Sequence, residues 1–209
     1  MDTKVIAVCM FVSSKQFDYV VCRSLLERIM QYAVERTELH KLAMLFLAVY
    51  VFLLRLPSEG LPLVAHEGDN SLSLEGDQLV IHLRRRKNRP AGSRLVRTCW
   101  CARSKPTCPI HVLGAYVAAV PAGHKLFQGI SASSALQGLR LMLRALTISR
   151  AGEYRTHDLR RGHAKDLQLS GKWRRRFLLF SVTQCLCRSA PMGNIGSRRV
   201  AIAGFPCLH

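Results

Sequence analysis

Two residues that can act on a phosphate group stand three positions apart, His157 and Arg160. They lie in the stretch Thr-His-Asp-Leu-Arg-Arg-Gly-His-Ala-Lys-Asp-Leu at 156–167. A helix places residues at this spacing on one face. An imidazole exchanges protons near neutral pH, and a guanidinium is a permanent cation with a fork of N–H donors. Together they suit the binding of a phosphate and the movement of protons around it, but this spacing is common, so the surrounding chain must support the interpretation.

A second group of residues has the chemistry of metal ligands: Cys99, Cys101, Cys108 and His111 lie within 13 residues. Thiolates and an imidazole are ligands that zinc prefers, and four of them complete a tetrahedral site. The Cys-x-Cys spacing is tighter than the usual gap of two to four residues. Two interpretations follow: a structural zinc ion, or reduced cysteines that pack as small apolar side chains.

The charge of the chain points to a polyanionic partner. Its 209 residues include 31 Lys and Arg against 13 Asp and Glu, a formal net charge of +18. Nucleic acid, here double-stranded DNA, is the partner that such a balance favours, and basicity for solubility alone is the simpler alternative. The 49% hydrophobic content predicts a folded core rather than a disordered chain.

The eight cysteines do not form the pattern of a small disulfide-stapled domain, and no signal-peptide pattern stands at the start of the chain. The apolar run 42–54 is 13 residues long, short of the roughly 20 that cross a bilayer. We therefore expect no membrane span and a reducing compartment, the nucleus if DNA is the partner.

Hydrophobic periodicity predicts a mainly α architecture with a small antiparallel sheet of three strands, an α+β fold. Helices are expected over 15–37, 39–54, 110–119, 133–147 and 157–169, and strands over 62–65, 79–83 and 94–98. The last two strands flank a basic turn at 84–92, in which Pro90 and Gly92 suit a hairpin loop. This hairpin would carry Lys87 at its tip.

Several phrases resemble one protein family in the same order. They are Phe-Leu-Leu-Arg-Leu-Pro-Ser-Glu at 52–59, Arg-Arg-Lys-Asn-Arg at 85–89, Cys-Trp-Cys at 99–101, Cys-Pro-Ile-His-Val-Leu-Gly at 108–114 and Tyr-Arg-Thr-His-Asp-Leu-Arg-Arg-Gly-His-Ala at 154–164. Over about residues 40–175 the chain resembles the catalytic domain of tyrosine recombinases, the phage-integrase class, and most closely the fungal Crypton-type recombinases. These enzymes break and rejoin DNA through a 3′-phosphotyrosyl link and require no metal or nucleotide.

The resemblance implies a role for each matching residue. Arg55 and Arg160 would stabilise the negative charge that gathers on the phosphate in the transition state. Lys87 would protonate the leaving 5′-oxygen, and His157 would hydrogen-bond the phosphate or help deprotonate the nucleophile. Trp173 would donate one further hydrogen bond. Taken without the resemblance, Arg55 suits a cap for a helix C-terminus, and Lys87 is one of several charges in a solvated turn.

Other charged residues near these positions have supporting roles in this interpretation. Glu59 is expected to pair with an arginine and orient it. The basic residues expected on the DNA backbone are Arg85, Arg86, Arg89 and Arg161. The family also acts as oligomers on DNA.

The chain departs from the family at the nucleophile. Its tyrosines are Tyr19, Tyr32, Tyr50, Tyr116 and Tyr154. Phe180 stands where the family has its nucleophilic tyrosine, and the segment between Gly171 and Trp173 is shorter than the family's. Phenylalanine has no hydroxyl, so we expect the chain as written to be inactive in strand cleavage.

Three regions are predicted: a helical segment or remnant of a DNA-clamping domain at 1–38, a recombinase-like catalytic domain at 39–171, and a basic, poorly ordered tail at 172–209. The leading hypothesis is a DNA-binding remnant of a site-specific tyrosine recombinase. The alternative is a non-enzymatic nucleic-acid-binding module with a Cys/His zinc site.

Overall fold

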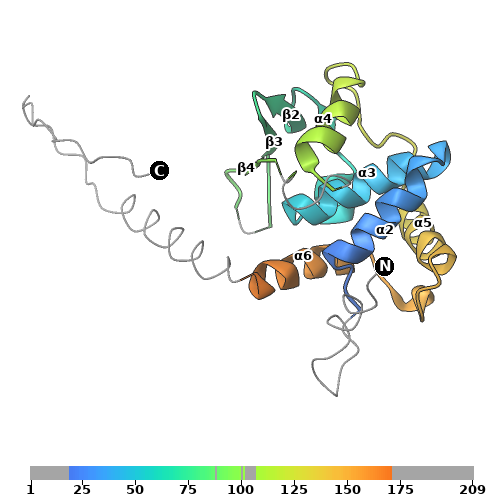
Figure 1. The fold of residues 1–209 in the computed structure, drawn as a ribbon. Helices are drawn as coiled ribbons and strands as arrows, with labels where there is room; N and C mark the ends of the chain where they lie inside the picture. The colour runs from blue at the N-terminus through green and yellow to red at the C-terminus, as the bar shows by residue number, and fades with distance from the viewer. Residues whose placement is uncertain (1–18, 88, 100, 102–106, 171–209) are drawn as a thin grey trace, which may run out of the picture. The chain divides into compact units, whose positions relative to one another are not determined.

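An apolar helix, α3 (Thr37–Phe52), lies at the centre of the fold in the computed structural model (Figure 1). Every residue from Ala43 to Phe52 is buried. A helix that is apolar on all sides is stable only when other elements cover it all round, and α3 is covered by helices on several sides and by the sheet. The structure describes residues 19–87, 89–99, 101 and 107–170.

Four further helices pack around this centre: α2 (Arg23–Val34), α4 (Pro109–Ala118), α5 (Ala132–Ala145) and α6 (His157–Leu169). Helices α4, α5 and α6 begin and end within about two residues of the expected positions. Helix α2 buries an apolar stripe that includes Leu26 and Ile29, and this stripe belongs to the same core as α3. The described residues form one compact unit that ends at Ser170. None of the described helices is long and apolar enough to cross a membrane.

The sheet differs from the prediction. It has four strands in the order β1 (Val64–Ala65), β2 (Asn70–Glu75), β3 (Gln78–Leu83) and β4 (Ser93–Arg97). Strand β1 pairs with β2 in parallel, whereas the other two pairings are antiparallel. The fold is thus α+β with a mixed sheet, and the expectation of three antiparallel strands was wrong.

The missing strand was β2, whose sequence Asn-Ser-Leu-Ser-Leu-Glu has the polar composition of a loop. It becomes a strand because Leu72 is fully buried and because every residue of β2 pairs with β3. The signal that could have found it is the two-residue turn Gly76-Asp77, which joins paired residues Glu75 and Gln78. Gly76 has a φ of 60°, a left-handed conformation that glycine adopts without strain.

The hairpin between β3 and β4 is present as expected, and its loop runs from residue 84 to 92. A bridge between Arg86 and Arg89 closes the end of the loop. At its base, Gly92 has a φ of 84°, and a Cβ there would lie 2.5 Å from the carbonyl oxygen of Leu83. Glycine is therefore required for the loop to return to β4. Lys87 is exposed in the turn at the far end.

Candidate functional site

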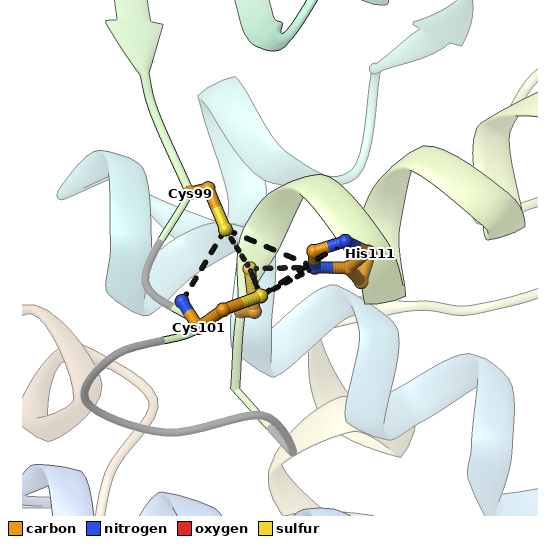
Figure 2. Close-up of side chains that lie close together, drawn as sticks. Cys99, Cys101 and His111 are labelled. Atoms are coloured by element: carbon orange, nitrogen blue, oxygen red, sulfur yellow. Dashed lines mark hydrogen bonds between the residues drawn. The ribbon is translucent and has the colours of Figure 1, made fainter.

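The predicted metal ligands gather at one point, where the chain leaves β4 and enters α4 (Figure 2). Cys99 and Cys101 follow the strand, Cys108 is the N-cap residue of α4, and His111 lies in the first turn of that helix. Their ligand atoms all lie within 4.8 Å of one another. The spacing in sequence predicted this group, which the structure places where the end of β4 and the start of α4 meet.

The distances within this Cys/His centre fit a tetrahedral ion. The Sγ atom of Cys108 lies 3.4 Å from that of Cys99 and 3.7 Å from that of Cys101. Zinc–sulfur bonds of about 2.3 Å would set tetrahedral sulfurs about 3.8 Å apart. The Nδ1 atom of His111 lies 2.9, 3.1 and 3.9 Å from the sulfurs of Cys101, Cys108 and Cys99, respectively. The geometry therefore directs Nδ1, rather than Nε2, to the centre.

The Cys101 thiol disfavours ionisation without a cation. Hydrogen bonding with Cys99 is the main cause that raises the pKa of the Cys101 thiol to about 12, and burial and the neighbouring Cys108 add to it. Three sulfurs this close repel one another when charged. A divalent cation would favour the ionised thiolates over the protonated thiols, because it binds the thiolate form and displaces the protons.

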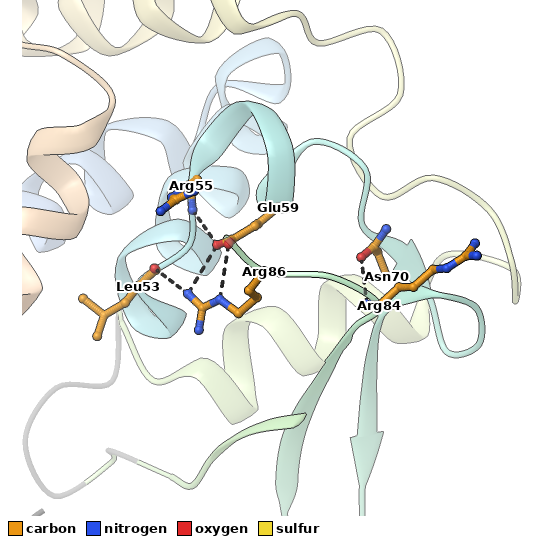
Figure 3. A network of polar contacts seen from close by, with 6 residues as sticks. All are labelled: Leu53, Arg55, Glu59, Asn70, Arg84 and Arg86. Atoms are coloured by element: carbon orange, nitrogen blue, oxygen red, sulfur yellow. Dashed lines mark hydrogen bonds and ion pairs between the residues drawn. The ribbon is translucent and has the colours of Figure 1, made fainter. Parts of the chain in front are cut away.

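Arg55 owes its position to the abrupt end of α3. The helix ends at Phe52, because Leu53 adopts a left-handed conformation with a φ of 56°. Arg55 is extended, and a single π-helical turn, η1 (Leu56–Gly60), follows it. The backbone N–H of Arg55 donates a hydrogen bond to Oε2 of Glu59, at 2.9 Å (Figure 3). Glu59 thus binds the backbone and leaves the Arg55 side chain free to point elsewhere.

The same carboxylate binds an arginine from the hairpin. Arg86 donates from Nε to Oε1 of Glu59 at 3.2 Å and from an Nη atom to Oε2 at 3.3 Å. Its guanidinium also donates to the carbonyl oxygen of Leu53. The Glu59 side chain is only 5% exposed, so this is a nearly buried pair. The expectation that Glu59 pairs with an arginine is confirmed, and Arg86, expected on DNA, has Nε and one Nη atom engaged inside the protein (Figure 3).

The two arginines expected to bind the phosphate, Arg55 and Arg160, have no carboxylate partner among the described residues. Arg55 and Arg160 are both half-buried, yet their guanidinium groups make no hydrogen bond or ion pair with any residue that the structure describes. A cation removed from part of its hydration shell is costly unless an anion compensates it. These two side chains are thus available to an anionic ligand, in contrast to Arg86.

Helix α6 begins at His157, as predicted. Asp158, which is buried, accepts a hydrogen bond from the backbone N–H of Arg155 at 2.8 Å. Its other oxygen lies 3.4 Å from Nε2 of His157 and 3.6 Å from a nitrogen of Arg161. His157 and Arg161 thus share one carboxylate at the exposed start of the helix.

A hollow of about 390 Å³ opens beside this helix start, and its lining includes Tyr19, Arg140, Arg155, His157, Asp158 and Arg161. The hollow brings together His157 and Arg161 of the predicted residues. Arg55 and Arg160 are not part of its lining, and no hydrogen bond or ion pair among the described residues joins Arg55 to His157 or Arg160. Arg85, Lys87 and Arg89 are exposed on the hairpin loop. Trp173 and Phe180 lie outside the described residues.

The contacts that hold α6 in place were not predicted. Asp166 accepts hydrogen bonds from the hydroxyl of Tyr50 on α3 and from the backbone N–H of Arg23 at the start of α2. Burial and the nearby Asp166 carboxylate raise the pKa of Tyr50 above its usual value, so it remains a neutral donor. The Tyr50 ring meets the edge of His163 with centroids 4.7 Å apart. No sequence signal linked Tyr50 to Asp166, because 116 residues separate them.

Comparison with family models, with curated proteins and with solved structures found no match to the chain.

Proposed function

We propose that the chain is a DNA-binding domain of the tyrosine-recombinase type, which holds a phosphodiester with Arg55 and Arg160 and lacks the nucleophile that would cleave it. The partner is double-stranded DNA, met in the nucleus. The proposal rests on the order of the recombinase-like phrases and on the net charge of +18. It is carried by one observation: Arg55 and Arg160 are half-buried and pair with no carboxylate among the described residues.

The surroundings of these arginines support the proposal. Glu59 binds the backbone of Arg55, so the turn is held while the guanidinium is left unused. The exposed Lys87 adds positive charge at the tip of the hairpin. The start of α6 supplies the positive end of a helix dipole close to His157. A phosphate bound by Arg55 or Arg160 would gain charge-assisted hydrogen bonds.

A salt titration with matched variants tests this function. The affinity for a DNA duplex should fall with salt, with a slope of about 0.9 log units for each phosphate contacted. Arg55→Gln and Arg160→Gln should each weaken binding roughly tenfold, the cost of a hydrogen bond to a charged group, and should each lower the slope by about 0.9. Arg36→Gln is the control, since Arg36 is exposed and lies over the Tyr32 ring.

The control should lose little affinity and keep the slope. Equal losses in all three variants would mean that the protein binds DNA through diffuse charge only, and the proposed site would be wrong. Absence of duplex binding at low salt would rule out DNA as the partner.

We also infer that Cys99, Cys101, Cys108 and His111 bind a structural zinc ion. The sulfur separations of 3.4 and 3.7 Å and the approach of Nδ1 support a tetrahedral site. This inference is independent of recombinase chemistry, because a zinc site would equally support the alternative function, a non-enzymatic nucleic-acid-binding module. The two functions differ in whether Arg55 and Arg160 contribute to binding.

Metal analysis of freshly purified, reduced protein should find about one zinc per chain. Cys101→Ser and Cys108→Ser should each lose it, because serine is a poor zinc ligand. The matched control is Cys22→Ser, since the Cys22 thiol lies at the start of α2, next to the Ser24 hydroxyl and outside the Cys/His centre. Zinc-free wild-type protein would instead identify these cysteines as packing residues.

A further inference from the structure

One arginine connects the Cys/His centre to the turn that carries Arg55. Arg97 is the last residue of β4 and lies two positions before Cys99. Its Nε atom donates a hydrogen bond of 2.8 Å to the carbonyl oxygen of Val51, and its guanidinium carbon lies 5.5 Å from the centre of the Phe52 ring. Both partners belong to the last turn of α3. Arg97 thus binds the helix end from which Arg55 emerges.

The end of α3 needs such donors. The last carbonyl groups of a helix have no partner within it, and here the helix stops without a glycine, at Leu53 in a left-handed conformation. Arg97 binds the carbonyl of Val51, and Arg86 binds that of Leu53. The two arginines come from opposite ends of the β3–β4 hairpin, so the hairpin holds the turn in two places. Arg86 is further held by Glu59, whereas Arg97 is held by the position of β4.

The Cys/His centre can hold that position. Cys99 and Cys101 continue directly from β4, and Cys108 and His111 belong to the start of α4. An ion bound by all four would join the end of the strand to the helix. Helix α4 packs against α3 and against β2 and β3, so the ion would anchor the end of β4 to the core.

We propose that Arg97 is a positioning residue, through which metal binding at the Cys/His centre strengthens the contact of Arg55 with a DNA phosphate. With the ion bound, the end of β4 is fixed and Arg97 holds the last turn of α3. Without the ion, this end of the strand loses its anchor, and the turn at Leu53–Arg55 loses the support of Arg97 while it keeps those of Arg86 and Glu59. The inference rests on the proposed DNA-binding function and adds a metal dependence to it.

The test measures duplex affinity and salt slope by fluorescence anisotropy, with zinc-loaded and chelator-treated protein. Chelation of the wild-type protein should weaken binding several-fold and lower the slope by about 0.9, the loss of one phosphate contact. Arg97→Met should do the same with zinc still bound, and zinc content measured in parallel confirms this. Arg97→Lys retains an N–H donor for the Val51 carbonyl and should keep the wild-type slope.

Two comparisons separate positioning from direct contact or from loss of folding. In an Arg55→Gln background, Arg97→Met should cause no further loss of slope, because both changes remove the same contact. Arg94→Met, on the same strand, removes one charge from an exposed pair with Glu75 and should leave the slope unchanged. Loss of folding would lower the fraction of protein that binds without changing the slope.

Additive slopes in the double variant would mean that Arg97 contacts DNA itself, and the inference would be overturned. It would also be overturned if chelation left the affinity and slope unchanged while Arg55→Gln lowered both. If Arg55→Gln matched the Arg36→Gln control, the proposed function itself would fail, and the inference would fail with it.

Discussion

At the scale of single residues, Glu59 is the group on which the turn around Arg55 depends. One nearly buried carboxylate accepts from the backbone of Arg55 and from two nitrogens of Arg86. It joins η1 to the hairpin loop, two segments that are far apart in sequence. Its removal would leave the Arg86 guanidinium partly buried without a counter-charge, which is the expensive outcome for such a pair.

We expect Glu59→Gln to lower the free energy of unfolding by about 1–3 kcal/mol, as the ion pair is lost while one amide oxygen still accepts from Arg55. Urea denaturation with and without the substitution measures this. Glu75→Gln is the matched control. Arg94 donates a hydrogen bond that lowers the pKa of Glu75, but that pair is about half exposed, and water and salt screen it. Its loss should change stability little.

Equal effects of the two glutamate substitutions would contradict the view that burial makes the Glu59 pair important.

At the scale of elements, the packing of α6 against the chain at the start of α2 determines where Arg160 lies. The backbone N–H of Val21 donates to the carbonyl of Asp158, and the chain at Val21 crosses α6 at Gly162. A Cβ on Gly162 would lie 1.9 Å from the carbonyl oxygen of Val21. Glycine is required at this position of α6 because the backbone at Val21 occupies the space that a side chain would need. A glycine within a helix lowers the stability of the helix, so the requirement comes from this crossing.

Gly162→Ala should therefore destabilise the protein by more than about 2 kcal/mol, because the backbone at Val21 must move away from α6 and lose its hydrogen bond to Asp158. Thermal or urea unfolding would measure the loss. Gly152→Ala provides the control, since the nearest atom to a Cβ there is the end of the Arg144 side chain at 3.9 Å. If Gly162→Ala were as stable as Gly152→Ala, the crossing of Val21 over α6 would be wrong.

At the scale of the whole molecule, the five tyrosine side chains all have contacts within the described fold. Tyr19 donates to Glu153, Tyr50 to Asp166 and Tyr116 to the carbonyl of Leu126. The Tyr32 ring lies under Arg36, and Tyr154 packs against the ring of Tyr19. A nucleophilic tyrosine needs a hydroxyl positioned beside the phosphate and a route for its proton. The hydroxyls of Tyr19, Tyr50 and Tyr116 are thus engaged within the fold, and the contacts described for Tyr32 and Tyr154 are made by their rings.

A suicide DNA substrate, which traps the 3′-phosphotyrosyl intermediate, should therefore yield no covalent complex with this chain. Under the proposed function, Phe180→Tyr should not restore one, because the segment between Gly171 and Trp173 is shorter than in the recombinases that the sequence resembles, and misplacement of a nucleophile by about an ångström costs large factors in rate. Denaturing gel electrophoresis of the trapped reaction is the measurement. A covalent adduct of the unmodified chain would overturn the assignment, and mapping the modified peptide would identify the tyrosine involved.

The sequence by itself determined α3, α4, α5 and α6 to within about two residues, because their signal is local, whereas the helix expected over 15–37 begins only at Arg23 and ends at Val34. An apolar run such as 43–52 and the regular spacing in 132–145 and 157–169 identify helices without reference to the rest of the chain. The Cys/His centre was also readable, since its four residues lie close together in sequence. The hairpin that carries Lys87 followed from the Pro and Gly of its turn.

Only the tertiary structure decided what depends on distant partners. Strand β2 is polar in composition and becomes a strand by pairing with β3, and β1 joins it in parallel, which no local pattern predicted. At the end of α3, the Glu59 carboxylate pairs with the side chain of Arg86, whereas Arg55 binds it only through its backbone N–H. Burial and pairing across long separations determine which arginine is engaged and which is left for a ligand, and these are properties of the packed chain rather than of any segment of it.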